Sequence, residues 1–174
     1  MNKYFRVFRY DWPLHFILLF TNWFPDNVFF LRLRGLLSSF FLKKCGKNLR
    51  LGRNITIYNP SNIKIGDHVY IAFGCWFLGA SEISIESEVM FGPYCVVSDG
   101  NHTSLNGSYR FGPSEVGKIV IKKGSWIGAH SVILMDVTIG RGALVAAHSL
   151  VNKAVDDFGI VGGVPAKYLK SEHA

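Results

Sequence analysis

The stretch KKGSWIGAHSVILMDVTIGRGALVAAHSLVNKAV, residues 122–155, decides the fold. Aliphatic residues recur at every sixth position from the residue before it, as Ile121, Ile127, Ile133, Ile139, Val145 and Val151. A period of six fits neither the roughly 3.6 residues of an α-helical turn nor the plain alternation of a long strand. Repetition at this short period is typical of a parallel β-helix.

The same step runs through the preceding part of the chain. It gives three further series, which are Leu51, Ile57 and Ile63, then Ile65, Ile71 and Phe77, then Ile85, Phe91 and Val97. Each hexapeptide is expected to form a short strand and a turn, and three of them close one triangular coil of about 18 residues. The aliphatic side chain points inward and stacks on its equivalent one coil away, at about 4.8 Å. We therefore predict an all-β fold, with a parallel β-helix over residues 47–155.

One long insertion interrupts the repeat. Residues 98–118, SDGNHTSLNGSYRFGPSEVGK, are polar, rich in glycine and without any period. We expect this segment to leave the β-helix as a loop. Loops on a rigid scaffold are frequent places for binding and catalytic groups.

Residues 1–46 have a different character. The first 50 residues carry nine basic and two acidic side chains, so the whole net charge of +7 lies there. We predict two helices, the first capped by Asp11 with Pro13 in its first turn. The second is expected to be capped by Asp26 and to end near Gly46. Residues 156–174 are predicted to form a turn and a short C-terminal helix.

The N-terminal segment has two interpretations. Its aromatic and aliphatic stripe, for example Phe29, Leu33 and Phe40, would pack on the rest of the protein. Alternatively, its basic and aromatic groups would contact an anionic membrane from the side. We expect no transmembrane helix, because Pro25 and Asp26 interrupt the apolar run, and no cleaved signal peptide.

The three cysteines, Cys45, Cys75 and Cys95, are an odd number without a CxxC pattern. They favour neither a disulfide framework nor a zinc site. We interpret Cys75 and Cys95 as packing residues of a cytoplasmic protein, with peripheral attachment to the inner face of the membrane as the alternative. The basic segment matches no nucleic-acid-binding motif, so we expect no nucleic acid partner.

Several motifs of the chain resemble a known family, the hexapeptide-repeat acyltransferases. The resemblance rests on FGPYCVVSDGNH (91–102), on residues 122–155 and on GGVPAKYLK (162–170), and it covers roughly residues 47–170. Maltose, galactoside and nodulation-factor acetyltransferases and the O-acetyltransferases of bacterial surface polysaccharides are the most similar. It implies a left-handed β-helix and homotrimers with active sites between neighbouring subunits. It also implies acetyl-CoA as donor and a saccharide hydroxyl as acceptor, with no metal.

The resemblance assigns catalysis to His102, which lies nine residues after Pro93 as in the family. A sugar hydroxyl is a poor nucleophile, and an imidazole can remove its proton near neutral pH. Asp99 is a second, weaker candidate that would orient the imidazole ring. An acidic residue in a Gly/Asn turn has an alternative role in the turn itself.

The resemblance also implies a set of residues that bind coenzyme A. Trp126 would line the cleft, and the backbone at Ala129 and Ala147, one coil apart, would contact the pantetheine arm. The full set is Trp126, Ala129, Ala147, Asn152, Lys153, Lys167 and Lys170. Lysine binds phosphate as a point charge, which suits the last two.

The chain departs from the sugar acetyltransferases at three positions. Ala72 stands where those enzymes have an asparagine that stabilises the oxyanion, and Gly79 and Ala80 stand where they have acidic residues that bind the acceptor. Recognition of maltose or galactosides is therefore doubtful, and a lipid-linked or polymeric acceptor would suit the basic aromatic N-terminus.

Other functions remain open from the sequence. The same base and donor site would serve N-acylation of an amino sugar, and the fold would also serve as a non-catalytic trimeric scaffold. A zinc enzyme would need converging histidines. His130 and His148 lie one coil apart, with His68 placed in the same slot of an earlier coil, but exposed turn residues are the simpler interpretation.

Overall fold

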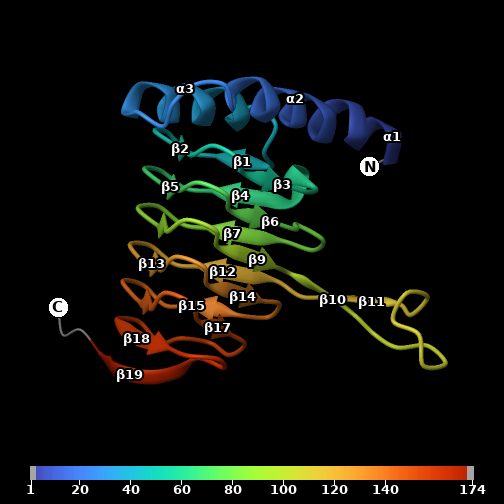
Figure 1. The fold of residues 1–174 in the computed structure, drawn as a ribbon, viewed down its shortest axis with the longest axis vertical. Helices are drawn as coiled ribbons and strands as arrows, with labels where there is room; N and C mark the ends of the chain where they lie inside the picture. Colours follow the sequence, from blue (N-terminus) through green and yellow to red (C-terminus); the bar gives the residue numbers. More distant parts are fainter. Residues whose placement is uncertain (1–2, 172–174) are drawn as a thin grey trace.

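The computed structural model describes residues 3–171. Figure 1 shows a solenoid of short parallel strands, with helices lying across its N-terminal end and a two-stranded arm projecting from its side. The last strands close the opposite end. The predicted parallel β-solenoid is thus confirmed.

Three sheets, parallel except for the last pair of strands in sheet B, form the faces of the solenoid. Sheet A pairs, in this order, β1 (Lys44–Cys45), β4 (Ile63–Ile65), β7 (Ile83–Ile85), β12 (Ile119–Ile121) and β15 (Thr138–Ile139). Sheet B contains β2 (Arg50–Leu51), β5 (Tyr70–Ile71), β8 (Met90–Phe91), β13 (Trp126–Ile127), β16 (Leu144–Val145), β18 (Gly159–Gly162) and β19 (Lys167–Ser171). Sheet C contains β3 (Thr56–Ile57), β6 (Trp76–Phe77), β9 (Val96–Ser98), β14 (Val132–Leu134) and β17 (Leu150–Val151). The chain visits the sheets in the order A, B, C in five coils, and β18 begins a sixth.

The hexapeptide residues fill the centre of the coils. Ile121, Ile127 and Ile133, one from each face, are fully buried. Cys75 and Cys95 are buried in the second inward position, as predicted. A continuous column of apolar side chains therefore runs along the axis and stabilises every coil through its neighbours.

The coils differ in length at one corner. The register pairs Ile65 with Ile85, twenty residues later, but Ile121 with Ile139, eighteen residues later. The two additional residues lie between sheets C and A, where the 3-10 turn η2 (Pro60–Asn62) widens the first coil. The long insertion after β9 leaves the solenoid at this same corner.

The N-terminal helices differ from the prediction in their caps. One helical run comprises α1 (Lys3–Arg6), the π-helical turn η1 (Val7–Asp11) and α2 (Trp12–Thr21). Asp11 lies inside it with helical backbone angles and no capping hydrogen bond, so it is not a cap. Its carboxylate instead lies 3.5 Å from Nε of Arg6. Local spacing pointed to Asp11, but the helical run had already begun at Lys3, about two turns earlier.

The second helix, α3 (Val28–Ser39), is capped by Asn27, whose Oδ1 accepts a hydrogen bond from the Phe30 N–H at 3.0 Å. Asp26, the predicted cap, is bound to the buried guanidinium of Arg34 at 3.1 Å. The helix ends at Ser39 rather than near Gly46, because β1 already pairs into sheet A.

Arg34 joins the helices to the solenoid. Its guanidinium donates to the carbonyl oxygens of Thr21, Phe24 and Leu51, besides the carboxylate of Asp26. Burial lowers the pKa of Arg34, and Asp26 opposes this shift. Across residues 3–171, no helix is long and apolar enough to cross a membrane.

The predicted C-terminal helix is wrong. Residues 156–171 form β18 and β19, an antiparallel pair that extends sheet B. The backbone groups at the end of sheet B offer hydrogen-bond partners to β19, and this pairing outweighs the local helical preference of AKYLK. Residues 172–174 of the predicted helix lie outside the described residues.

Candidate functional site

The arm that carries His102 is a hairpin. Its strands β10 (Gly100–His102) and β11 (Ser114–Val116) pair antiparallel, with His102 opposite Ser114. Thr103 closes the ladder, since its N–H and its hydroxyl donate to the Pro113 carbonyl oxygen at 3.0 and 2.7 Å. The side chain of His102 is exposed. The predicted loop is therefore in part a ribbon that holds the imidazole away from the solenoid.

Asp99 fastens the base of the arm. Its side chain is fully buried, and its two carboxylate oxygens accept hydrogen bonds from the N–H groups of Ala80 at 2.8 Å and Ser81 at 2.7 Å. Both partners belong to the wide corner of the preceding coil. The structure shows no bond between Asp99 and His102, so the two catalytic candidates are not brought together by this chain.

Trp126 lies on the outer surface of sheet B. It is 46% exposed and stands in register between Met90 and Leu144 of the neighbouring strands. Since the inward residue Ile127 follows it, the pleat directs Trp126 outward.

Ala129 and Ala147 lie one coil apart at the corner between sheets B and C. The Ala129 carbonyl accepts from the N–H of His148, but within residues 3–171 the N–H groups of Ala129 and Ala147 have no hydrogen-bond partner. The coils approach closely here, because a Cβ on Gly128 would lie 2.5 Å from the Ala147 nitrogen. Two unpaired amide donors on an open corner are ready to bind the carbonyl groups of an extended ligand.

Lys167 and Lys170 are exposed on β19, at the end of sheet B that lies beyond Trp126. Asn152 and Lys153 are also exposed, but they follow β17 and occupy the corner between sheets C and A. This corner is the one from which the arm leaves, two coils earlier.

The predicted site residues therefore fall into two groups within one chain. The arm group contains Asp99, His102, Asn152 and Lys153, and the sheet B group contains Trp126, Ala129, Ala147, Lys167 and Lys170. Sheet C separates their two corners. In Figure 1 the arm leaves on the side away from β13 and β18.

Sheet C carries a feature that the sequence analysis missed. Its outward positions form a row of partly exposed side chains that are mostly apolar, namely Trp76, Val96, Val132 and Leu150. The corresponding row of sheet A begins with Lys44, Lys64 and Ser84. This row could have been found in the sequence, because each outward residue directly precedes an inward residue of the hexapeptide series.

Neither Cys45 nor Cys75 offers an activated thiolate. A hydrogen bond with Cys75 lowers the pKa of Cys95, but the Cys95 side chain is fully buried and out of reach of a substrate. A hydrogen bond to Cys95 and burial raise the pKa of the Cys75 thiol. Burial, with a contribution from Asp67, raises the pKa of Cys45 to about 11. A thiol in such surroundings is a poor nucleophile at neutral pH.

The histidine ladder is confirmed for His130 and His148, but not for His68. His130 and His148 stack with 4.8 Å between ring centroids, and Tyr94 stacks on His130 at 4.9 Å. His68 lies at the corner between sheets A and B, where its Nδ1 is 2.9 Å from the Asn48 amide nitrogen. Its placement in the same slot was wrong, because His68 follows β4 of sheet A, whereas His130 and His148 follow strands of sheet B. Among residues 3–171 no group of His, Cys, Asp or Glu side chains could hold a metal ion.

The positions that depart from the sugar acetyltransferases also have places in the structure. Ala72 is buried, and its N–H donates to the Phe91 carbonyl oxygen at 3.1 Å. Gly79 and Ala80 form the wide corner that Asp99 holds. None of these three residues has a carboxylate, so they offer no acidic group to an acceptor near the arm.

The chain is similar to known proteins. The family described as bacterial transferase hexapeptide (six repeats) matches residues 118–153. A hexapeptide-repeat acetyltransferase of Vibrio cholerae, solved with acetyl coenzyme A, is 30% identical and superimposes with a TM-score of 0.80, covering 91% of this chain and 85% of the other.

Two curated proteins are also similar. The galactoside O-acetyltransferase of Lactococcus lactis is 27% identical over 122 residues, which are 66% of this chain and 59% of the relative. A putative acetyltransferase of Staphylococcus aureus is 34% identical over 110 residues, 63% of this chain and 55% of the relative. The chain thus spans less than two thirds of both curated relatives.

Proposed function

The chain belongs to the hexapeptide-repeat acetyltransferase family, and from this we propose that it transfers an acetyl group from acetyl-CoA to a hydroxyl of a saccharide. The proposed acceptor is a bacterial surface polysaccharide or its precursor. The alternatives of N-acylation and of a scaffold without activity are outcomes of the test below.

One observation carries the proposal, namely the course of the sheet B group along the solenoid. Trp126, the unpaired N–H groups of Ala129 and Ala147, and the lysines of β19 follow one another toward the C-terminal end. Acetyl-CoA carries its groups in the matching order. Its thioester is followed by a pantetheine arm with two amides and then by phosphates. The aromatic ring, the amide donors and the cations each suit one part of it.

The proposed reaction needs no covalent intermediate. The imidazole of His102 removes the proton from the acceptor hydroxyl while its oxygen attacks the thioester carbonyl. The tetrahedral intermediate collapses, the C–S bond breaks, and the imidazolium returns its proton to the sulfur of coenzyme A. The raised pKa values of Cys45 and Cys75 and the complete burial of Cys95 support direct transfer over an acyl-enzyme.

We further propose that the site forms between copies in a homotrimer of left-handed solenoids. The arm group and the sheet B group flank sheet C, so no single chain can bring His102 beside Trp126. If the apolar row of sheet C faces a three-fold axis, the corner with Ala129 of one copy lies next to the arm corner of the next. Burial of Trp76, Val96 and Val132 would stabilise this arrangement.

Titration calorimetry with acetyl-CoA tests the donor site without knowledge of the acceptor. We expect saturable binding near one molecule per chain, weakened about tenfold or more by the joint change Lys167→Ala and Lys170→Ala. Lys122→Ala with Lys123→Ala removes two lysines at another corner and should leave the affinity unchanged. Absence of binding at millimolar acetyl-CoA would refute the enzyme and favour the scaffold.

Release of coenzyme A thiol with a panel of saccharides then tests the acceptor. Turnover with neutral sugars supports O-acetylation. Turnover confined to amino sugars would contradict it and favour N-acylation.

A further inference from the structure

The outer surface of the N-terminal helices is apolar, although no residue of the described part of the chain, 3–171, covers it. Along α1, η1 and α2 and in the turn after α2, the exposed side chains include Phe5, Phe8, Trp12, Phe16, Leu19, Phe20 and Trp23, which we call the aromatic stripe. Phe20 is 69% exposed and Trp23 is 87% exposed. Leu14 and Leu18, on the opposite side of α2, are buried against the rest of the protein. The helix is thus apolar on both sides, whereas a helix that covers a soluble protein presents one apolar and one polar side.

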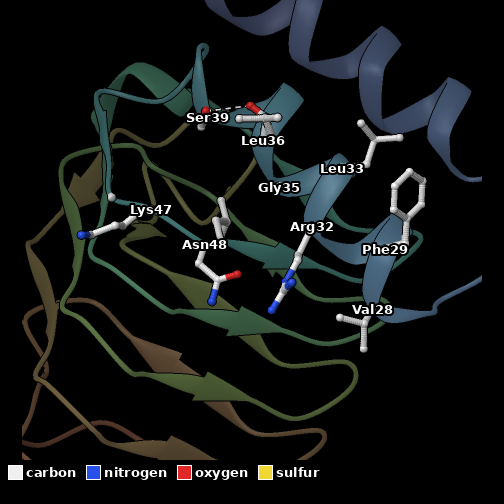
Figure 2. Close-up of a pocket in the computed structure, with 11 residues that line it drawn as sticks. Val28, Phe29, Arg32, Leu33, Gly35, Leu36, Ser39, Lys47 and Asn48 are labelled. Atoms are coloured by element: carbon white, nitrogen blue, oxygen red, sulfur yellow. Dashed lines mark hydrogen bonds between the residues drawn. The ribbon is translucent and has the colours of Figure 1, made fainter.

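The outer side of α3 continues this surface. Four exposed residues recur at four-residue spacing and therefore share one side of the helix. They are Val28, Arg32, Leu36 and Phe40, the last directly after α3. Between α3 and the turn that precedes β2 lies an open groove of about 720 Å³. Figure 2 shows Val28, Phe29, Arg32 and Leu36 from α3, with Lys47 and Asn48 from the turn.

Two cations border this apolar groove without a carboxylate partner. Arg32 and Lys47 are exposed, and neither forms an ion pair with any residue from 3 to 171. Elsewhere on the solenoid, lysines such as Lys64 and Lys118 are paired, here with Glu82. The unpaired cations therefore lie beside exposed hydrocarbon, which is the arrangement that an anionic amphiphile complements.

From these contacts we propose that the helical end of the molecule binds the surface of an anionic phospholipid membrane. The aromatic stripe enters the boundary between head groups and acyl chains, where Trp and Phe side chains are favoured. The groove takes hydrocarbon, and Arg32 and Lys47 bind lipid phosphate. The helices lie in the plane of the interface, since none of those in the described part of the chain can span it.

The charge of the surface selects this partner over a second copy of the chain. The first 50 residues carry all of the net charge of +7. Two copies that met through their helical ends would bring these charges together and would repel each other. Each basic residue placed near an anionic surface raises the affinity about fivefold.

Flotation of the full chain with vesicles tests the proposal, and it requires neither donor nor acceptor. We expect binding to vesicles of phosphatidylcholine with phosphatidylglycerol, and weak binding to phosphatidylcholine alone. The joint change of Trp12, Phe16 and Phe20 to Ser should lower the affinity at least about tenfold. Tyr109→Ser with Phe111→Ser removes exposed aromatic groups from the arm and should leave the affinity unchanged.

A second pair of variants tests the charges. Arg32→Gln with Lys47→Gln should lower the affinity about thirtyfold on anionic vesicles only, as the loss of two surface-bound cations requires. Lys122→Gln with Lys123→Gln changes the net charge equally, far from the helices, and should have little effect. Far-UV circular dichroism would establish that each variant is folded.

Three results would overturn the proposal. The first is absence of flotation with anionic vesicles, and the second is equal flotation of the variant that lacks Trp12, Phe16 and Phe20. The third is a higher oligomer in sedimentation that the same three changes disperse, because the stripe would then be an interface between copies. Failure of acetyl-CoA binding would leave the membrane proposal intact, so the two proposals fail separately.

Discussion

The carboxylate of Asp99, at the start of the arm, accepts a hydrogen bond from the N–H of Ala80 in the preceding coil, at 2.8 Å. Its second oxygen is bound by the N–H of Ser81 at 2.7 Å. This buried carboxylate therefore determines where the arm begins, and with it where His102 lies.

Asp99→Asn replaces one acceptor oxygen by an NH₂ group that faces a backbone N–H. We expect a loss of about 1–3 kcal/mol in the free energy of unfolding, because a buried donor is left without its partner. Urea denaturation measures the loss. A variant with wild-type stability but strongly reduced turnover would show that Asp99 orients His102 instead.

His102→Ala removes the proposed base. Turnover should fall roughly 10²–10⁴-fold, the usual contribution of a general base, while calorimetric binding of acetyl-CoA is retained. His68→Ala, on the corner between sheets A and B, is the matched control and should leave turnover unchanged. Unchanged turnover of the His102 variant would remove this residue from the mechanism.

Arg34→Leu tests the attachment of the helices. The change leaves Asp26 and the carbonyl groups of Thr21, Phe24 and Leu51 without their common donor. We expect a loss of about 3–5 kcal/mol, the cost of breaking a buried ion pair by removing one partner. Arg32→Leu, an exposed position of the same helix, should change the stability little, and equal losses for both would contradict the assigned role of Arg34.

Glu82 makes the stability of the folded protein depend weakly on pH in the acidic range. Hydrogen bonds from Lys64, Lys43 and Lys118, at 2.7, 2.9 and 3.0 Å, lower the pKa of its carboxyl to about 2. Because the pKa is lower in the folded state, the stabilisation is complete above the ordinary pKa of glutamate and is lost as the pH falls toward 2.

The variant Glu82→Gln should therefore have a lower Tm than the wild type at pH 7, and the difference should vanish in strong acid. The side chain remains 20% exposed, so solvent screening limits the effect to about 2–4 °C. Thermal unfolding of both proteins across this pH range measures it. A difference that grows in acid would contradict the assigned cause.

Two glycines with the same backbone angle allow the stability cost of a steric clash to be measured apart from the cost of a strained backbone. Gly74 and Gly124 both have a φ of +73°, but a Cβ on Gly74 would lie 2.6 Å from the Tyr94 ring, whereas Gly124 faces open space. Both alanine variants should lose about 1–2 kcal/mol through the left-handed conformation. Gly74→Ala should lose more, because Tyr94 must leave its stack on His130. Equal losses would show that the ring moves aside freely.

The sequence predicted those parts of the fold that depend on local repetition. Ile121, Ile127 and Ile133 identify one coil, because every coil requires an apolar side chain at its inward positions. The lengths of the early coils were not predicted, since the wide corner at Pro60 keeps the inward series and changes only the turn. His68 was misplaced because the hexapeptide slot alone does not tell which of the three sheets precedes it.

Features that depend on distant partners were predicted less well. Asp26 has the local features of a helix cap, but Arg34 engages it from the next helix. The C-terminal segment was predicted to be helical because nothing local reveals that β18 offers it an edge. In the candidate site, the positions of His102 and Trp126 followed from the resemblance, whereas their separation by sheet C is a property of the folded chain.

The arm leaves the third coil, and the helices cover the first. Successive coils are about 4.8 Å apart, so the backbone at β9 lies roughly 10 Å from the backbone at β3. The number of coils between them thus fixes the distance from the arm to the helices along the axis of the solenoid. A coil inserted between them would move the arm about 4.8 Å further from the helices, so the number of repeats determines how far the arm lies from the N-terminal helices.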